Sequence, residues 1–275
     1  MADNIILDLD SAAMYLTDNR NGGASRIYRG VARAFKTRGA LYEGTWEKYH
    51  KGDPFGVSGQ DGTEFLQIAS NAADSVINSG KFALDNVGVA NGYWSLFNQV
   101  DYSSSKEVMF WRAYSYQDLV TQHWNQYSSA GANRGVTKSM IDAYLCTDGE
   151  PISVSPLYKG DDSLNLVIQN RDPRLKQTIY TPGDIIFSAA TYPTGQPFLF
   201  QSPALDAGGE TRNVTGYQLY KGHSLDYNQA LAINKAGKPG QNYIRYAEIL
   251  LNAAEAKAEL GTITQADLDQ TINLI

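Results

Sequence analysis

The clearest pattern of apolar and polar positions lies near the end of the chain, over residues 243–260. On a helix, apolar and small side chains in this stretch cover most of the circumference. The polar side chains share one narrow stripe, which consists of Arg245, Glu248, Asn252, Glu255 and Glu259. A helix that is apolar on most sides packs against several neighbours, and its alanines let those neighbours approach closely. We therefore expect a buried helix over residues 243–260 with other helices on both flanks.

The same stretch begins a helical hairpin. Gly261 supplies a helix stop, and Thr264 with Asp267 resembles a capping box that opens a second helix over residues 267–275. The apolar pattern is still running at Ile275, so we expect the chain to be an internal fragment of a longer protein.

Helical periodicity also predicts helices over residues 5–16, 25–49 and 63–79. Residues 34–82 repeat the hairpin pattern weakly, with an alanine-bearing helix, a glycine-bearing turn at Gly44 and a second amphipathic helix. A long loop is inserted at residues 50–62. These patterns predict helical hairpins of the tetratricopeptide type.

The middle of the chain alternates short elements with glycine and proline. We expect six short elements there: a buried helix or turn at 93–97, a helix at 137–144 capped by Thr137, and strands at 107–114, 175–180, 184–189 and 216–221. The predicted architecture is a helical scaffold, at about 1–82 and 243–275, with a loop-rich and strand-rich excursion at about 83–242.

Four stretches carry a resemblance to a known family. They are IRYAEILLNAAEAKAELG (244–261), RGALYEGTWEKYH (38–50), MIDAYLCTDGEPI (140–152) and NRDPRLKQTIY (170–180). In this order they resemble the SusD/RagB family, the cell-surface glycan-binding lipoproteins of Bacteroidetes nutrient-uptake systems. The resemblance implies a mainly α fold with tetratricopeptide-like hairpins and a single SusD-like domain over 1–275, which we expect to be truncated at both ends.

Composition narrows the classes of partner. The 275 residues are 43% hydrophobic with a net charge of −6 and no run of basic residues, which argues against nucleic acid or an anionic membrane surface. Cys146 is the one cysteine, and nothing beside it lowers a thiol pKa, so we expect a packing thiol. The first residues lack a secretion signal, and the signal peptide and lipid-modified cysteine of the family are absent from this sequence.

Aromatic, amide and arginine side chains gather after the strand at 107–114, in a stretch that we interpret as a loop. Aromatic faces stack on the C–H groups of sugars, while amides and arginine bond sugar hydroxyls. The candidate ligand-binding residues are Tyr116, His123, Trp124, Asn125, Tyr127, Arg134 and, further along, Tyr192, with Phe198 and Phe200 as secondary candidates. The alternative is that Trp124 and Tyr127, three residues apart, share one buried helical face.

Three classes of function remain open. The resemblance implies a non-catalytic glycan-binding protein at the outer-membrane surface, where it works with a SusC-like TonB-dependent transporter in nutrient uptake. A glycoside hydrolase would need two carboxylates across a sugar bond, and no carboxylate pattern marks such a pair. A tetratricopeptide-type interaction scaffold is the third class. His50, His123 and His223 lack metal spacing and no nucleotide-binding motif occurs, so we expect no catalytic residues, metal or cofactor.

Overall fold

The computed structural model describes residues 1–19, 25–85, 88, 90–231 and 237–275. The chain divides into two compact units. Unit 1 comprises Met1–Val87, Tyr102–Arg112 and Gln241–Ile275, and unit 2 comprises Gly88–Asp101 and Ala113–Gly240.

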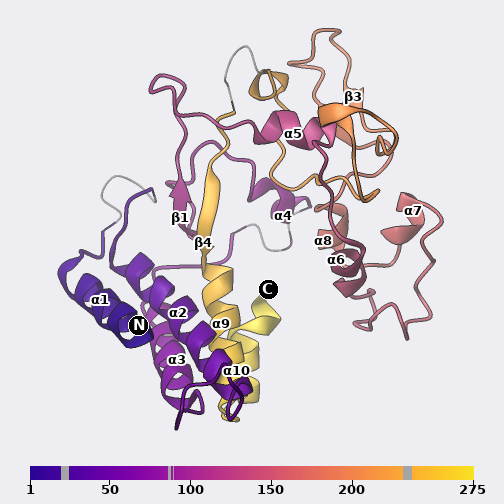
Figure 1. The fold of residues 1–275 in the computed structure, drawn as a ribbon. Coiled ribbons are helices and arrows are strands. Elements are labelled where there is room, and N and C mark those ends of the chain that lie inside the picture. The colour runs from indigo at the N-terminus through magenta and orange to yellow at the C-terminus, as the bar shows by residue number, and fades with distance from the viewer. Residues whose placement is uncertain (20–24, 86–87, 89, 232–236) are drawn as a thin grey trace. The chain divides into compact units, whose positions relative to one another are not determined.

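Helices make up most of unit 1. They are α1 (Ala2–Tyr15), α2 (Arg29–Tyr49), α3 (Thr63–Ile77), α9 (Tyr246–Glu259) and α10 (Gln265–Gln270), followed by a short 3-10 turn, η4 (Ile272–Leu274). Helix α2 packs against α1 and α3, and α3 packs against α9 (Figure 1). The predicted capping box is present, since Thr264 accepts from the Asp267 N–H and the Asp267 carboxylate accepts from the Thr264 N–H. The mainly α fold class with helical hairpins is therefore confirmed.

Unit 1 also contains a two-stranded antiparallel sheet of β1 (Val108–Arg112) and β4 (Gln241–Arg245). The prediction of a helix from residue 243 was wrong at its start, because residues 243–245 belong to β4 and the helix begins at Tyr246. Ile244 is buried whereas Tyr243 is exposed, which is the alternation of a half-buried strand. Pairing with β1 satisfies backbone groups that a helix would otherwise satisfy.

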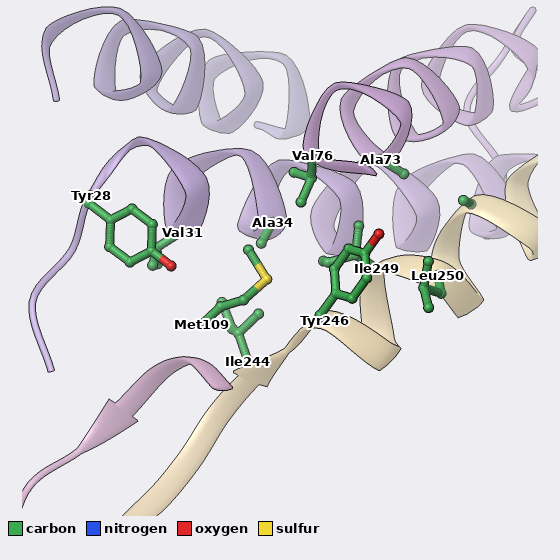
Figure 2. Packing of buried hydrophobic residues seen from close by; sticks show 11 residues of the cluster. Tyr28, Val31, Ala34, Ala73, Val76, Met109, Ile244, Tyr246, Ile249 and Leu250 are labelled. Atoms are coloured by element: carbon green, nitrogen blue, oxygen red, sulfur yellow. The ribbon is translucent and has the colours of Figure 1, made fainter. Parts of the chain in front are cut away.

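The core of unit 1 joins the helices to this sheet. Figure 2 shows Met109 of β1 and Ile244 of β4 beside Val31 and Ala34 of α2. Ile249 and Leu250 of α9 belong to the same buried cluster. Ala34, Ala73 and Ala253 are almost completely buried in this cluster, as expected where helices approach closely.

Gly44 lies inside α2, so the prediction that it forms a turn was wrong. It is buried where α2 meets α3, and a Cβ added to it would lie 2.8 Å from both the backbone nitrogen and the Cγ of Leu66. The turn of this hairpin is instead the inserted loop at 50–62, as the rest of the pattern predicted. Gly44 therefore acts as a close-packing residue between the two helices.

Unit 2 consists of short elements joined by long connections. They are α4 (Gly92–Ser95), α5 (Trp124–Ala130), α6 (Lys138–Ala143), α7 (Leu164–Val167), α8 (Pro173–Lys176), a two-stranded antiparallel sheet of β2 (Ile185–Phe187) and β3 (Phe198–Leu199), and the 3-10 turns η1 (Gly209–Thr211) and η2 (Tyr227–Gln229). Thr137 caps α6 as predicted, because its side chain accepts from the Met140 N–H.

Two predicted strands of unit 2 are replaced by other structure. Residues 175–180 do not form a strand: Asp172 caps α8 through the Arg174 N–H, and Pro173 occupies the first turn, where its fixed φ suits a helix. Residues 216–221 contain one isolated bridge, from Leu219 to Ile179. In the first case a local cap, and in the second a single long-range bridge, replaces the expected strand.

In the described part of the chain, no helix is both long enough and apolar enough to cross a membrane.

Candidate functional site

A cavity of about 460 Å³ lies beside helix α5 in unit 2, and we call it the α5 cavity. Aromatic, aliphatic, amide, hydroxyl and guanidinium groups and two glycines surround it. The lining residues are Trp124, Tyr127, Ser128, Gly131, Asn133, Arg134, Gly135, Val136, Val214, Gln218 and Leu219.

Helix α5 supplies the aromatic wall. The Gln122 side chain accepts from the Trp124 N–H and so satisfies one of the free donors at the start of the helix. Gly131 ends the helix with a φ of +97°. The interpretation of this stretch as a loop was therefore wrong, and Trp124 and Tyr127 do share one helix. Both are only partly buried, and both line the α5 cavity.

The segment after α5 places Arg134 at the same cavity. Gly131, Ala132 and Asn133 all have positive φ, a conformation that costs free energy for alanine and asparagine and persists only where surrounding contacts hold it. The Asn133 N–H donates to the Arg212 carbonyl at 2.8 Å. The wholly buried Asn213 donates from Nδ2 to the Arg134 carbonyl at 2.7 Å. These contacts fix the turn from which the Arg134 side chain emerges.

Arg134 and Tyr127 meet within the α5 cavity. The guanidinium carbon lies 5.8 Å from the centroid of the Tyr127 ring, within the range of a cation–π contact. Arg134 is exposed, so its N–H groups remain accessible from solvent. The cavity thus combines two aromatic groups with a cationic donor of hydrogen bonds.

The buried His223 connects helix α5 to strand β2. The His223 Nε2 lies 2.7 Å from the Ile186 carbonyl and its Nδ1 lies 2.8 Å from the Ser128 hydroxyl. A carbonyl can only accept, so Nε2 carries the proton and Nδ1 accepts from Ser128. Burial lowers the pKa of His223 to about 4. The neutral imidazole therefore links β2 to Ser128 of α5, and Ser128 is one of the residues that line the α5 cavity.

Four of the sequence-predicted residues lie elsewhere. Tyr116 is 48% exposed in a turn closed by the bridge between Ser115 and Val120. His123 precedes α5, exposed, with its ring 6.2 Å from that of Tyr127. These positions do not line the α5 cavity.

The other two are engaged within the protein. The Asn125 side chain is wholly buried, donating to the Ser224 carbonyl and accepting from the Ser224 N–H. Tyr192 stacks on Phe198 with ring centroids 5.3 Å apart, in a cluster whose other members include Phe187. Of the secondary candidates, Phe198 is half-exposed and Phe200 is buried.

Sequence reasoning missed the far wall of the α5 cavity. Val214, Gln218 and Leu219 come from a segment that follows α5 by more than eighty residues, and their residue types carry no signal of ligand binding. The turn of Gly131 to Asn133 had a weak signal in its small-residue composition. Among the described residues, no group of three or more histidines, cysteines or carboxylates is arranged to hold a metal ion.

Comparison with protein families identifies the chain. The sequence model of the SusD family matches residues 95–275, which include the α5 cavity and helix α9. The chain belongs to the SusD family. Three of the four stretches that suggested this resemblance, at 140–152, 170–180 and 244–261, lie within the matched residues, and the stretch at 38–50 lies outside them.

Solved structures of SusD-like proteins share this fold. A SusD-like carbohydrate-binding protein from Bacteroides fragilis matches with a TM-score of 0.67 and 22% identity, over 98% of this chain and 48% of that chain. A SusD superfamily protein from Parabacteroides distasonis matches with a TM-score of 0.52 and 17% identity, over 96% of this chain and 47% of that one. This chain therefore spans about half the length of these SusD-like structures. No curated protein matches it.

Proposed function

We propose that the chain binds an oligosaccharide or polysaccharide in the α5 cavity without cleaving it. The observation that carries the proposal is that Trp124, Tyr127 and Arg134, three of the residues selected from the sequence, line one cavity. The aromatic faces would stack on sugar C–H groups, and the guanidinium would donate to sugar hydroxyls. The solved relative from Bacteroides fragilis is described as carbohydrate-binding, which supports the same class of ligand.

The composition of the lining supports binding without turnover. Glycoside hydrolysis uses two carboxyl groups placed on either side of the glycosidic bond. The described residues around the α5 cavity supply aromatic, amide, hydroxyl and guanidinium groups and no carboxyl group. These groups can hold a sugar. Protonation of the glycosidic oxygen that leaves during hydrolysis would need a carboxyl group that does not line the cavity.

We infer the cellular role from membership of the family. The protein would act at the outer-membrane surface and pass its glycan to a SusC-like TonB-dependent transporter during nutrient uptake. Attachment to the membrane would be through a lipid anchor. Nucleic acid is not an expected partner because the chain has a net charge of −6.

Titration calorimetry against a panel of neutral and acidic polysaccharides tests the binding proposal. Trp124→Ala should weaken binding by about five- to thirtyfold, since stacking on a large aromatic group contributes on the order of 1 to 2 kcal/mol. Trp46→Ala, which removes an indole from α2 in unit 1, is the matched control and should bind normally. A parallel assay for reducing ends should detect no release. Equal binding by both variants, or release of reducing ends, would refute the proposal in its present form.

A protein-interaction scaffold is the second candidate, and one observation favours it. Tyr42, Trp46 and Tyr49 are 65%, 37% and 67% exposed along α2, although large aromatic side chains are costly to leave in water. If the folded chain binds no polysaccharide in the panel, a scaffold role becomes the better account of the same fold.

A further inference from the structure

A second cavity, of about 390 Å³, lies in unit 1 and has no part in the proposed glycan site. It is lined by the end of α3, by the first residues of α2 and by the segments before and after these helices. We call it the Arg33 cavity. The residues that matter to its chemistry are Asp18, Arg29, Arg33, Asn78, Lys81 and Phe82.

The charge of the Arg33 cavity is opposite to that of the whole chain. Arg29, Arg33 and Lys81 supply three positive charges, and Asp18 is the one acidic residue among the described lining. The Asp18 carboxylate lies 3.0 Å from the Arg29 guanidinium and 3.1 Å from the Lys81 ammonium. Its hydrogen bond with Lys81 is the main cause of a lowered pKa, so Asp18 is anionic at neutral pH. A local excess of positive charge remains in a chain of net charge −6.

The cations keep donors that the described protein does not use. Arg29 donates from Nε to the Ala13 carbonyl and from Nη1 to Asp18, which occupies part of its guanidinium. The Lys81 ammonium forms an ion pair with Asp18. Arg33 has no hydrogen bond or ion pair with any described residue, although it is near enough to act electrostatically on Asp18. A guanidinium has five N–H donors, and one without an acceptor in a recess is suited to a carboxylate or phosphate.

The neutral groups of the Arg33 cavity do not favour an uncharged sugar. The Ser75 and Ser79 hydroxyls donate their protons to the Asn71 and Val76 carbonyls, at 2.8 and 2.7 Å, so neither has a proton left for a ligand. The strongest donors that remain are the cationic groups of Arg29, Arg33 and Lys81, and charged donors favour an anion over a neutral hydroxyl. An oxygen-rich anion matches that bias.

Two packed aromatic rings form part of the lining of the Arg33 cavity. The rings of Tyr28 and Phe82 lie 6.4 Å apart and close to parallel. Gly30 permits this, since a Cβ there would lie 2.7 Å from the Tyr28 ring and 2.9 Å from the Phe82 ring. A rigid apolar floor beside cations strengthens charge-assisted hydrogen bonds because it excludes water from one side.

We propose that the Arg33 cavity binds a compact oxyanion, such as the carboxylate of an acidic monosaccharide or a phosphate. Arg33 would form the principal contact, while Arg29 and Lys81, held in place by Asp18, would add positive potential. The Arg33 cavity shares no lining residue with the α5 cavity, so this proposal can be tested separately from the proposed glycan binding.

Calorimetry on the full chain in a low-salt buffer tests this site, with sodium glucuronate, inorganic phosphate and glucose as separate probes. Glucuronate, phosphate or both should bind and glucose should not bind here, and added salt should weaken the binding. Arg33→Gln should weaken anion binding by about tenfold, which corresponds to the loss of a charge-assisted hydrogen bond. Arg26→Gln is the matched control, because Arg26 is exposed nearby and does not line the cavity.

The two anions separate the possible sources of the oxyanion. Binding of glucuronate alone would assign the site to carboxylated sugars, and comparable binding of phosphate would assign it to compact oxyanions in general; either supports the proposal. Absence of binding by both anions, or equal weakening by Arg33→Gln and Arg26→Gln, would overturn it. Circular dichroism of both variants checks that the helices remain folded.

Discussion

At the scale of single residues, Gly222 controls the position of Trp124. It has a φ of +81°, and a Cβ at this position would lie 2.9 Å from the Trp124 indole nitrogen. Gly222→Ala should therefore displace the indole from the wall of the α5 cavity and weaken glycan binding, besides destabilising the fold by roughly 1 kcal/mol through the strained φ. Titration calorimetry with a polysaccharide that binds the parent chain measures the effect.

Gly183→Ala is the control for that substitution. Gly183 has a φ of +94° and open space around its Cβ position, so it should show the loss of stability without the loss of affinity. If the two variants bind equally well, Gly222 does not position Trp124.

His223 makes stability depend on pH. Its folded pKa of about 4 lies below the value of about 6.5 for an unfolded histidine, so the unfolded chain takes up the proton first as the pH falls. The contribution of the neutral imidazole is complete above about pH 6.5 and is lost between about 6.5 and 4. Relative to His223→Gln, the parent chain should lose roughly 2 kcal/mol of unfolding free energy between pH 7 and pH 5.

Denaturant unfolding of both chains at several pH values measures that difference. Carboxyl groups titrate in both proteins alike, so their effects cancel in the comparison. A constant difference between pH 7 and pH 5 would show that folding does not lower the pKa of His223.

Residue types were enough to select part of the α5 cavity from the sequence. Trp124, Tyr127 and Arg134 are close in the chain, so a local pattern could indicate them together. Asn125 has the same chemical character, but its helix directs the side chain to Ser224, and that direction is fixed by contacts about a hundred residues apart. Which of several neighbouring polar residues faces a cavity depends on long-range packing that composition does not encode.

At the scale of elements, two of the three glycines within α2, Gly39 and Gly44, should respond oppositely to the same change. Gly44→Ala places a Cβ 2.8 Å from the backbone nitrogen of Leu66, which no rotamer change can relieve, and should destabilise unit 1 by about 1 to 3 kcal/mol. Gly39→Ala meets nothing within 4 Å and should stabilise the helix by about 0.5 to 1 kcal/mol. Thermal or denaturant unfolding of both variants provides the measurement. Destabilisation of similar size in both would contradict close packing at Gly44.

Long helices were predictable from sequence because many residues contribute to one period. Helices α1, α2, α3 and α9 were all expected, and their errors lie at their ends. The segment at 243–245 satisfies a helical pattern and a strand pattern equally well, and pairing with β1 decides between them. At 175–180 the local cap formed by Asp172 outweighs the strand preference of the apolar run that follows.

At the scale of the whole molecule, the family could be predicted because its sequence signatures are spread along the chain. Residues 244–261 and 170–180 lie within the stretch that the SusD family model matches. The number of independently folding parts could not be predicted in the same way. Our proposal of a single domain over residues 1–275 means that both units unfold together. Whether they do so depends on the free energy of unfolding of each unit and on the chain connections between the units.

The course of the chain gives a physical reason to expect cooperative unfolding. It passes between the two units after Val87, Asp101, Arg112 and Gly240, so unit 1 is assembled from three segments and unit 2 from two. When one unit unfolds, the other must hold its segments together across long flexible loops, which costs conformational entropy. We therefore predict that both units unfold in one transition.

Hydrogen exchange in increasing denaturant, followed by mass spectrometry, can observe each unit separately. Peptides from α3 report on unit 1, and peptides covering β2 report on unit 2. Their protection should be lost at the same denaturant concentration. Gly44→Ala, whose contacts are confined to unit 1, should then lower both midpoints equally. If the substitution lowers the midpoint of α3 and leaves that of β2 unchanged, the chain contains two domains, because free energy lost in one unit would then have no effect on the other.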